Sequence, residues 1–255
     1  MEEIKGLALF RDRFAAHQDK YFLIGGCALY TTLSEAGQEP RATKDLDIVL
    51  VVEAIDQSFV ELFWQFVEEG GYEIRQAGND ERRNFYRFKR PTNPDFPAML
   101  ELFSRSAALA RPLAEGSTLT PIPMAEEVES LSAILLDDEY YEFILARRRT
   151  LLGLPYISEE CLIPLKALAW LEMRERKANG EQVDSSDIRK HLMDVFTLTR
   201  LLTEGVGFGV SPRIAEDIRR FTSQARKENP SMERFGRNAV LEDFLLRIEA
   251  AFSAA

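Results

Sequence analysis

Three features are scarce or absent in this sequence: cysteine, long apolar runs and an excess of positive charge. Cys27 and Cys161, the two cysteines, stand in apolar surroundings without partners at metal-ligand spacing, which predicts buried reduced thiols. No apolar run approaches the roughly 20 residues that a membrane-spanning helix needs. Charges interrupt the apolar positions of residues 1–14, unlike the layout of a signal peptide. We therefore expect a cytoplasmic protein with no membrane contact.

The charge balance limits the classes of partner. The formal net charge is -10 and the sequence pI is about 5.0, which argues against broad, sequence-independent nucleic-acid binding. A local basic groove stays open as an alternative. Hydrophobic residues make up 45% and charged residues 29% of the chain, as in a soluble globular protein. A chain of 255 residues is long enough for one large domain or two modest ones.

The hydrophobic pattern changes along the chain. Its first half mixes strand-like and helical segments, whereas helical periodicity dominates after about residue 158. The pattern predicts strands at 21–24, 45–52, 72–78, 84–90 and 98–105, and helices at 3–17, 27–35, 55–71, 159–177, 187–202, 211–227 and 238–252. Residues 131–146 fit a hairpin turning at Asp137-Asp138, or a helix. The expected fold class is α+β, a mixed β-sheet with flanking helices (1–150) followed by an α-helical bundle (151–255).

The strand beginning at Asp45 carries the most informative pair of residues. Because strand side chains alternate between faces, Asp45 and Asp47 point the same way while Leu46 and Ile48 point into the core. Aspartate is a poor strand residue, and two such anions repel each other unless a cation lies between them. Mg²⁺, which prefers carboxylate oxygens, would resolve both problems. The alternative is an exposed strand end with two solvated acids.

Other residues fit the same hypothesis. Gly25-Gly26 ends a strand and opens a helix, where backbone N–H groups and the helix dipole can hold phosphate. Glu101 lies between apolar neighbours in a later strand, and it completes a three-carboxylate cluster if that strand adjoins the Asp45 strand. The alternative is an acid on the solvent face of an edge strand. Arg41-Ala42-Thr43-Lys44, directly before the acids, offers donors to phosphate oxygens.

The order of these motifs resembles that of the DNA polymerase β-like nucleotidyltransferase superfamily. Residues 21–52 are most similar to the AbiEii/MenT-type group, found as toxins of toxin–antitoxin pairs. The resemblance continues into the later helices, where Lys166 and Asp194 match a lysine and an acid of that group. The chain departs from the pattern by a longer gap between Gly26 and Asp45 and by His191, where many relatives have aspartate.

The resemblance implies an NTP-dependent nucleotidyltransferase, with transfer to an acceptor hydroxyl on the 3′ end of tRNA or on another RNA. It also implies Mg²⁺ or Mn²⁺ as cofactor and a cognate antitoxin as partner. The implied catalytic and metal-binding residues are Asp45, Asp47 and Glu101. The implied nucleotide-binding residues are Gly25, Gly26, Thr43, Lys44, Lys166 and Asp194. The alternative from another class is an inactive nucleotide-binding or partner-binding module with the same fold.

Three further hypotheses concern residues outside the acidic strand. Lys166 follows an apolar run in a predicted helix, so its ammonium is expected to point inward and neutralise triphosphate charge; the alternative is a lysine that extends along the helix face. His191 and Asp194 lie three apart on one helix face and can touch.

A basic segment interleaved with aromatic residues suits RNA, although such a run is usually a solvated strand face. Its members are Arg75, Arg82, Arg83, Phe85, Tyr86, Arg87, Phe88, Lys89 and Arg90, with Arg147-Arg148-Arg149 as a second basic cluster.

Overall fold

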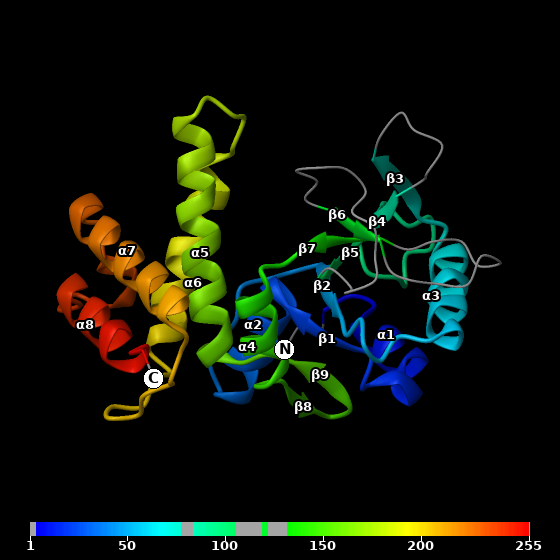
Figure 1. Cartoon of the computed structure of the whole chain (residues 1–255), viewed down its shortest axis with the longest axis horizontal. Helices are drawn as coiled ribbons and strands as arrows, with labels where there is room; N and C mark the ends of the chain where they lie inside the picture. Colours follow the sequence, from blue (N-terminus) through cyan, green and yellow to red (C-terminus); the bar gives the residue numbers. More distant parts are fainter. Residues whose placement is uncertain (1–3, 78–83, 106–118, 122–131, 255) are drawn as a thin grey trace. The chain divides into compact units, whose positions relative to one another are not determined.

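A nine-stranded mixed sheet dominates the first part of the chain (Figure 1). The computed structural model describes residues 4–77, 84–105, 119–121 and 132–254. The strands are β1 (Tyr21–Ile24), β2 (Asp45–Leu50), β3 (Glu73–Ala77), β4 (Asn84–Lys89), β5 (Met99–Ser104), β6 (Leu119–Pro121), β7 (Ser132–Leu135), β8 (Arg149–Leu151) and β9 (Leu154–Tyr156). Their main order is β3-β4-β5-β2-β1-β9-β8, and β7 joins β5 and β6. Parallel pairs, such as β2 with β5, and antiparallel pairs, such as β1 with β2, both occur.

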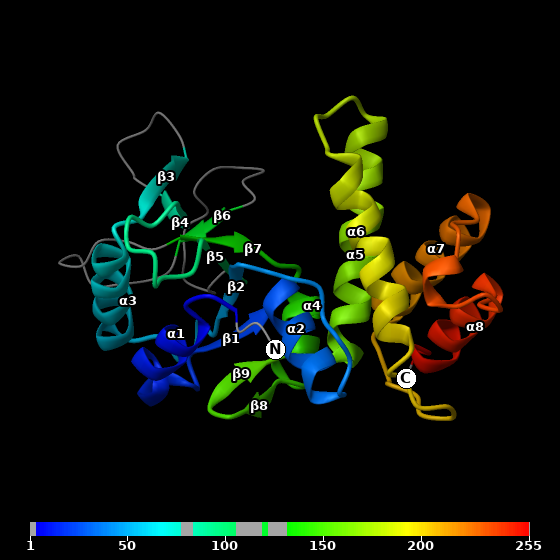
Figure 2. The ribbon, with the colours of Figure 1, turned by 180° about the vertical axis from the view of Figure 1, so that it is seen from behind.

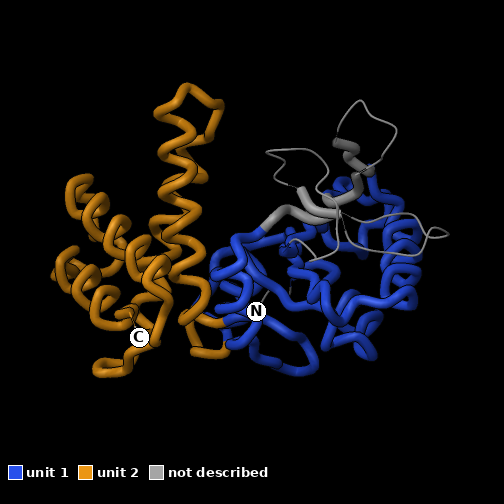
Figure 3. Tube along the Cα trace, in the orientation of Figure 1, with its two compact units in different colours: residues 1–34, 39–157 blue, residues 35–38, 158–255 orange. Residues whose placement is uncertain are grey.

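The helices divide between two compact units (Figure 3). Unit 1 comprises residues 1–34 and 39–157, and unit 2 comprises residues 35–38 and 158–255. The helices of the first part are α1 (Leu7–Arg13), the 3₁₀ turn η1 (Ala15–His17), α2 (Gly25–Glu35), α3 (Gln57–Gly70) and α4 (Asp138–Leu145). Those of the second are α5 (Glu159–Ala178), α6 (Ser185–Thr199), α7 (Pro212–Glu228), the 3₁₀ turn η2 (Glu233–Phe235) and α8 (Leu241–Ala251). The predicted α+β class, a mixed sheet followed by helices, is confirmed.

An aromatic core covers one face of the sheet in unit 1. The apolar stripe of α3 buries Phe59, Phe63 and Phe66 completely, and the Asp56 side chain caps the helix by accepting a hydrogen bond from the Phe59 N–H. Phe14 packs against Phe59 with ring centroids 5.5 Å apart, and Phe63 packs against Phe88 of β4 at 5.5 Å. Helix α3 therefore lies against the face of β4 to which Phe88 points.

Unit 2 is a helical bundle with its own aromatic core. Helices α5 and α6 run alongside each other (Figures 1 and 2), and α7 packs against both α5 and α8. Trp170 of α5 meets Phe221 of α7 edge to face at 5.2 Å, and both rings are completely buried. Phe196 of α6 contacts the same cluster through Phe221, Phe235 and Phe244. Among the described residues, no helix is both long and apolar enough to cross a membrane.

The structure differs from the sequence-based expectations in a few segments. The segment 131–146 is neither a hairpin nor a single helix, because β7 is followed by α4, which begins where Asp137 caps the Glu139 and Tyr140 N–H groups. Gly25 and Gly26 belong to α2 itself, so the helix begins directly at the end of β1. The hairpin formed by β8 and β9 was not predicted.

Candidate functional site

The strand register places the predicted acids on one face of the sheet in unit 1. Asp47 of β2 pairs with Glu101 of β5, and Glu101 pairs with Arg87 of β4. Side chains in register on neighbouring strands face the same side of a sheet. These three residues therefore form a row across β2, β5 and β4, which we call the acid row. The strand of Glu101 does adjoin that of Asp47, which was the condition for Glu101 to join the acids of β2.

The opposite face of the same strands belongs to the core. Leu46 pairs with Leu100, and Leu100 pairs with Phe88, and all three side chains are completely buried. Phe88 packs on α3, so this face is the one that the helices cover. The alternation that buries Leu46 and Leu100 is thus the physical reason why Asp47 and Glu101 point to the other face.

Asp45 extends the acidic region along β2. It lies two residues before Asp47, on the same strand face, and both side chains are half-buried. Within the described parts of the chain, the Asp45 carboxylate makes no hydrogen bond or ion pair. An unpaired carboxylate beside a second one is electrostatically unfavourable and favours binding of a cation.

The N-terminus of α2 lies against the Asp47 carboxylate. The Gly26 N–H donates to Asp47 Oδ2 at 3.4 Å, and Ile24 pairs with Asp47 across β1 and β2. Gly25 has a φ of 62°, and a Cβ atom there would lie 1.8 Å from Asp47 Oδ2. Glycine is therefore required at position 25 both by the backbone conformation and by the close approach of the carboxylate. The positive end of the helix dipole stabilises the negative charge of Asp47.

Neighbouring groups complete the surroundings of Asp47. A Cβ atom on Gly26 would come within 2.7 Å of Thr43 Oγ1, so Thr43 also lies against the start of α2. Lys44 is exposed, and its carbonyl accepts a hydrogen bond from the Ala98 N–H at 3.0 Å. Burial raises the pKa of the Cys27 thiol, and the negative charge of Asp47 raises it further. Cys27 is therefore a neutral thiol, in agreement with the predicted buried, reduced cysteine.

Glu101 has a protein partner that the sequence did not reveal. The Arg87 guanidinium bonds Glu101 Oε1 through both Nε and Nη2, and the side chains are 25% and 12% exposed. Within the described residues, no group of three or more His, Cys, Asp or Glu side chains is arranged to hold a metal ion. The carboxylates of Asp45 and Asp47 do suit one hard cation, since Mg²⁺ is often held by one or two carboxylates together with water and substrate phosphates.

Lys166 and Asp194 form a buried ion pair within unit 2. Lys166 Nζ lies 2.8 Å from Asp194 Oδ2, and the side chains are 5% and 6% exposed. The expectation that the Lys166 ammonium points inward is confirmed, but its role in triphosphate binding stays a prediction. Burial and the positive charge of Lys166 lower the pKa of His191 on α6 to about 4. His191 is therefore a neutral imidazole at neutral pH.

The basic segment is only partly suited to RNA. Phe88 is completely buried, so the prediction that this ring stacks on bases is wrong; the strand alternation directs it into the core. Lys89 lies two residues from Arg87 on the acid-row face, and no ion pair of Lys89 is found in the described chain. Arg90 pairs with Glu73 at 3.4 Å. Arg82 and Arg83 lie outside the described residues, as do the side chains of Arg75, Phe85 and Tyr86.

The second basic cluster contacts its own surroundings. Arg147 lies over the Phe143 ring at 4.3 Å, and Arg148 donates to the Asp19 carbonyl at 3.2 Å. Arg149 is exposed in β8. The guanidinium groups of Arg147 and Arg148 are thus engaged by the protein, which weakens the case for this cluster as an RNA contact.

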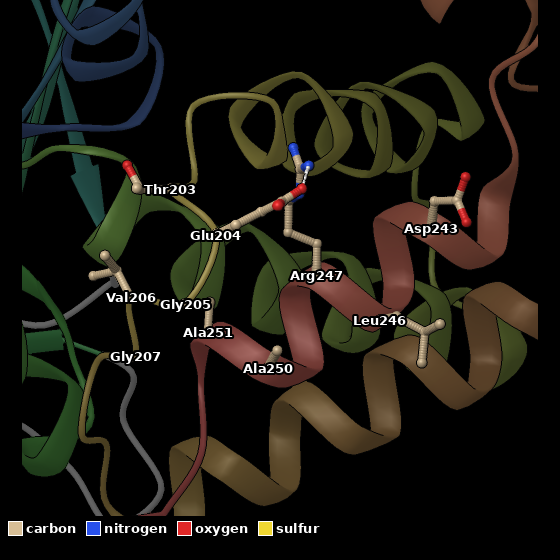
Figure 4. Close-up of a pocket in the computed structure, with 10 residues that line it drawn as sticks. All are labelled: Thr203, Glu204, Gly205, Val206, Gly207, Asp243, Leu246, Arg247, Ala250 and Ala251. Atoms are coloured by element: carbon tan, nitrogen blue, oxygen red, sulfur yellow. Dashed lines mark hydrogen bonds and ion pairs between the residues drawn. The ribbon is translucent and has the colours of Figure 1, made fainter.

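The surface hollows in the described part of unit 2 include the following two. The first, of about 660 Å³, is lined by Val206 and Leu246 and by the ion pair of Glu204 with Arg247 at 2.9 Å (Figure 4). The second, of about 610 Å³, is lined by residues of α5, α6 and the end of α7, including Arg189. Neither lining includes a residue predicted from the sequence to be functional. The acid row with Asp45 and the start of α2 is therefore the candidate site.

Comparisons with known proteins add little to this geometry. No family model matches the chain, and no curated protein matches it. The solved structure of the Megavirus polyadenylate synthase aligns with a TM-score of 0.39 and 11% identity, over 87% of this chain and 36% of that one. This chain thus spans little more than a third of the synthase. A candidate nucleotidyltransferase from H. pylori aligns with a TM-score of 0.37 and 14% identity, over 96% and 92% of the two chains. Scores this low do not establish a common fold, so the candidate site rests on its own residues.

Proposed function

We propose that unit 1 carries a metal-dependent nucleotidyltransferase site, which moves an NMP group from an NTP to an acceptor hydroxyl. The observation that carries the proposal is the arrangement around Asp47. Asp45 and Asp47 share one strand face, Asp45 has no partner among the described residues, and the first turn of α2 lies at Asp47. Two carboxylates beside a helix N-terminus form a site for a cation and a phosphate chain together.

Asp45 and Asp47 would hold the divalent cation, Mg²⁺ or Mn²⁺. Such an ion neutralises triphosphate charge and stabilises the leaving pyrophosphate. Gly25, Gly26 and Thr43, at the start of α2, would orient the phosphates through backbone N–H and hydroxyl donors. Lys44, exposed directly before Asp45, would add a positive charge.

The proposed reaction is a displacement at the α-phosphorus of the NTP. The oxygen of the acceptor hydroxyl forms a bond to the α-phosphorus, and the bond from that phosphorus to the bridging oxygen breaks. Pyrophosphate leaves with the electron pair of the broken bond. The hydroxyl proton passes to a base, and we propose Glu101 of the acid row for this role.

RNA, such as the 3′ end of a tRNA, is the acceptor class that we propose. Lys89 brings positive charge to the face that carries Asp47, where an RNA backbone would need it. The toxin subtype, the cognate antitoxin and the roles of Lys166 and Asp194 in nucleotide binding are further proposals. They rest on the resemblance of residues 21–52 and of the later helices to AbiEii/MenT-type sequences.

The test is nucleotide transfer with a matched pair of variants. Purified protein is incubated with each of the four radiolabelled NTPs, Mg²⁺ and total RNA. Asp45→Asn is expected to lower transfer at least about a hundredfold, because the cation loses a charged ligand. Asp95→Asn, which changes an exposed loop aspartate of the same unit, is expected to leave transfer unchanged. Equal transfer by Asp45→Asn and Asp95→Asn would contradict the site.

A second candidate function is a nucleotide-binding or partner-binding module without turnover. The ion pair of Glu101 with Arg87 favours this alternative, since it engages the proposed base. Mg²⁺-dependent NTP binding that Asp45→Asn abolishes, without transfer to RNA, protein or small molecules, would select the module over the enzyme.

A further inference from the structure

The ion pair in the acid row bears on how many cations the site can hold. Glu101 lies between Asp47 and Arg87 in the strand register, so its carboxylate has an acid on one side and a guanidinium on the other. Both Nε and Nη2 of Arg87 bond the same atom, Glu101 Oε1. The protein has therefore already supplied one positive charge at the third carboxylate.

The position of Arg87 on β4 keeps its ion pair with Glu101 in place. Its strand neighbour Phe88 is completely buried against α3, which anchors β4 and fixes the face on which Arg87 lies. With side chains 25% and 12% exposed, the pair is poorly hydrated, so breaking it would leave Glu101 as an uncompensated charge. A divalent ion at Glu101 would have to displace the guanidinium or bind beside it against charge repulsion.

Asp45 of β2 differs from Glu101 in this respect. Asp45 has no partner within the described residues, so no positively charged side chain of the described chain pairs with it. The described residues contain no group of three or more acids, cysteines or histidines arranged to hold a metal, consistent with Glu101 being directed to Arg87.

We infer that Arg87 takes the place of a second divalent cation at Glu101, so that the site binds a single ion, on Asp45 and Asp47. This inference rests on the proposed function. Arg87 acts as a positioning residue: it fixes Glu101 and supplies a charge that does not depend on metal concentration. A mechanism in which a second ion bridges to Glu101, the simplest expectation from three acids, is then excluded for the wild-type chain.

The experiment counts bound Mn²⁺ per chain in the presence of a non-hydrolysable NTP analogue, using the electron paramagnetic resonance signal of free Mn²⁺. The wild-type protein is expected to bind one ion, and Arg87→Met is expected to bind two, because Glu101 is released. Arg87→Lys keeps the positive charge and is expected to bind one. Arg90→Met, which changes an exposed arginine of the same strand region, is the matched control and is expected to bind one.

A second variant tests the inference even where Arg87→Met fails to fold. Glu101→Gln is expected to leave the count at one and the affinity for that ion unchanged, since Glu101 holds no ion. Two ions on the wild-type chain, one ion on a folded Arg87→Met variant, or loss of the ion in Glu101→Gln would each overturn the inference. A wild-type chain that binds no ion with any NTP analogue would overturn the proposed function instead.

Discussion

Gly25 joins β1 to α2 at the point where the backbone comes nearest to Asp47. Its φ of 62° is unfavourable for other residues, and an added Cβ would lie 1.8 Å from Asp47 Oδ2. Gly25→Ala is expected to cost roughly 1–2 kcal/mol for the backbone, with more for the displaced carboxylate, and to reduce nucleotide transfer strongly. Gly37→Ala is the matched control, because Gly37 has a φ of 68° but open space around it. Urea unfolding and the transfer assay measure both effects; full transfer activity in Gly25→Ala would contradict the need for this carboxylate position.

His191 makes stability depend on pH. Its pKa is lowered to about 4 in the folded protein by burial and by the charge of Lys166, against about 6.5 in an unfolded chain. Between these values only the unfolded state takes up the proton, so the free energy of unfolding falls as the pH drops from 6.5 to 4. The free energy of unfolding is expected to be higher above pH about 6.5 than below pH about 4 by roughly 3 kcal/mol from this group.

The measurement for His191 is urea unfolding of the wild-type protein and of His191→Gln at pH 7 and pH 5. The wild-type protein is expected to lose more stability than the variant over this interval, because glutamine takes up no proton. Equal losses in both proteins would show that His191 does not cause the pH dependence.

Helices α5 and α6 are joined by the buried pair of Lys166 and Asp194. Removing one partner leaves a buried charge, so Lys166→Met and Asp194→Leu are each expected to cost roughly 3–5 kcal/mol of the free energy of unfolding. The double variant is expected to lose much less than the sum, since it leaves no charge behind. Lys177→Met, near the exposed end of α5, is the control and is expected to change stability by less than about 0.5 kcal/mol. Additive losses in the double variant would mean that the two charges are not coupled.

Most helices and the three strands of the acid row were predictable because their local signals agree with their packing. The 3.6-residue stripe of α3 and the alternation in β2 correspond to faces that are buried. The hairpin of β8 and β9 has strands of only three residues each, too short for a periodic signal. The helix was predicted to begin at residue 27, after Gly25-Gly26, because glycine is a poor helix former. The contact with Asp47 that requires Gly25 is tertiary.

The candidate site was predictable to a different extent at each residue. Asp45 and Asp47 were identified because aspartate within an apolar strand is unusual, and Glu101 was identified by the same reasoning. The register of Glu101 with Asp47 was left open by the sequence and comes from the structure. Arg87 was assigned to RNA contact, because its ion pair with Glu101, 14 residues later in the chain, cannot be inferred from composition. Alternation around Phe88 was the available signal: a buried Phe88 requires Arg87 and Lys89 to face the acids.

The two compact units have separate hydrophobic cores, and this separation predicts independent folding of residues 158–255. Their core is built around Trp170, Phe196 and Phe221, all completely buried, and the helices carry their own caps, such as Ser211 at α7. The isolated fragment is expected to give a helical circular dichroism spectrum and one cooperative thermal transition. Phe221→Ala in the fragment should cost about 3–5 kcal/mol and abolish the transition, because a domain of this size has little more stability than that. A fragment without a cooperative transition would mean that unit 2 depends on the rest of the chain for its fold, and that the division between residues 157 and 158 does not mark an autonomous domain.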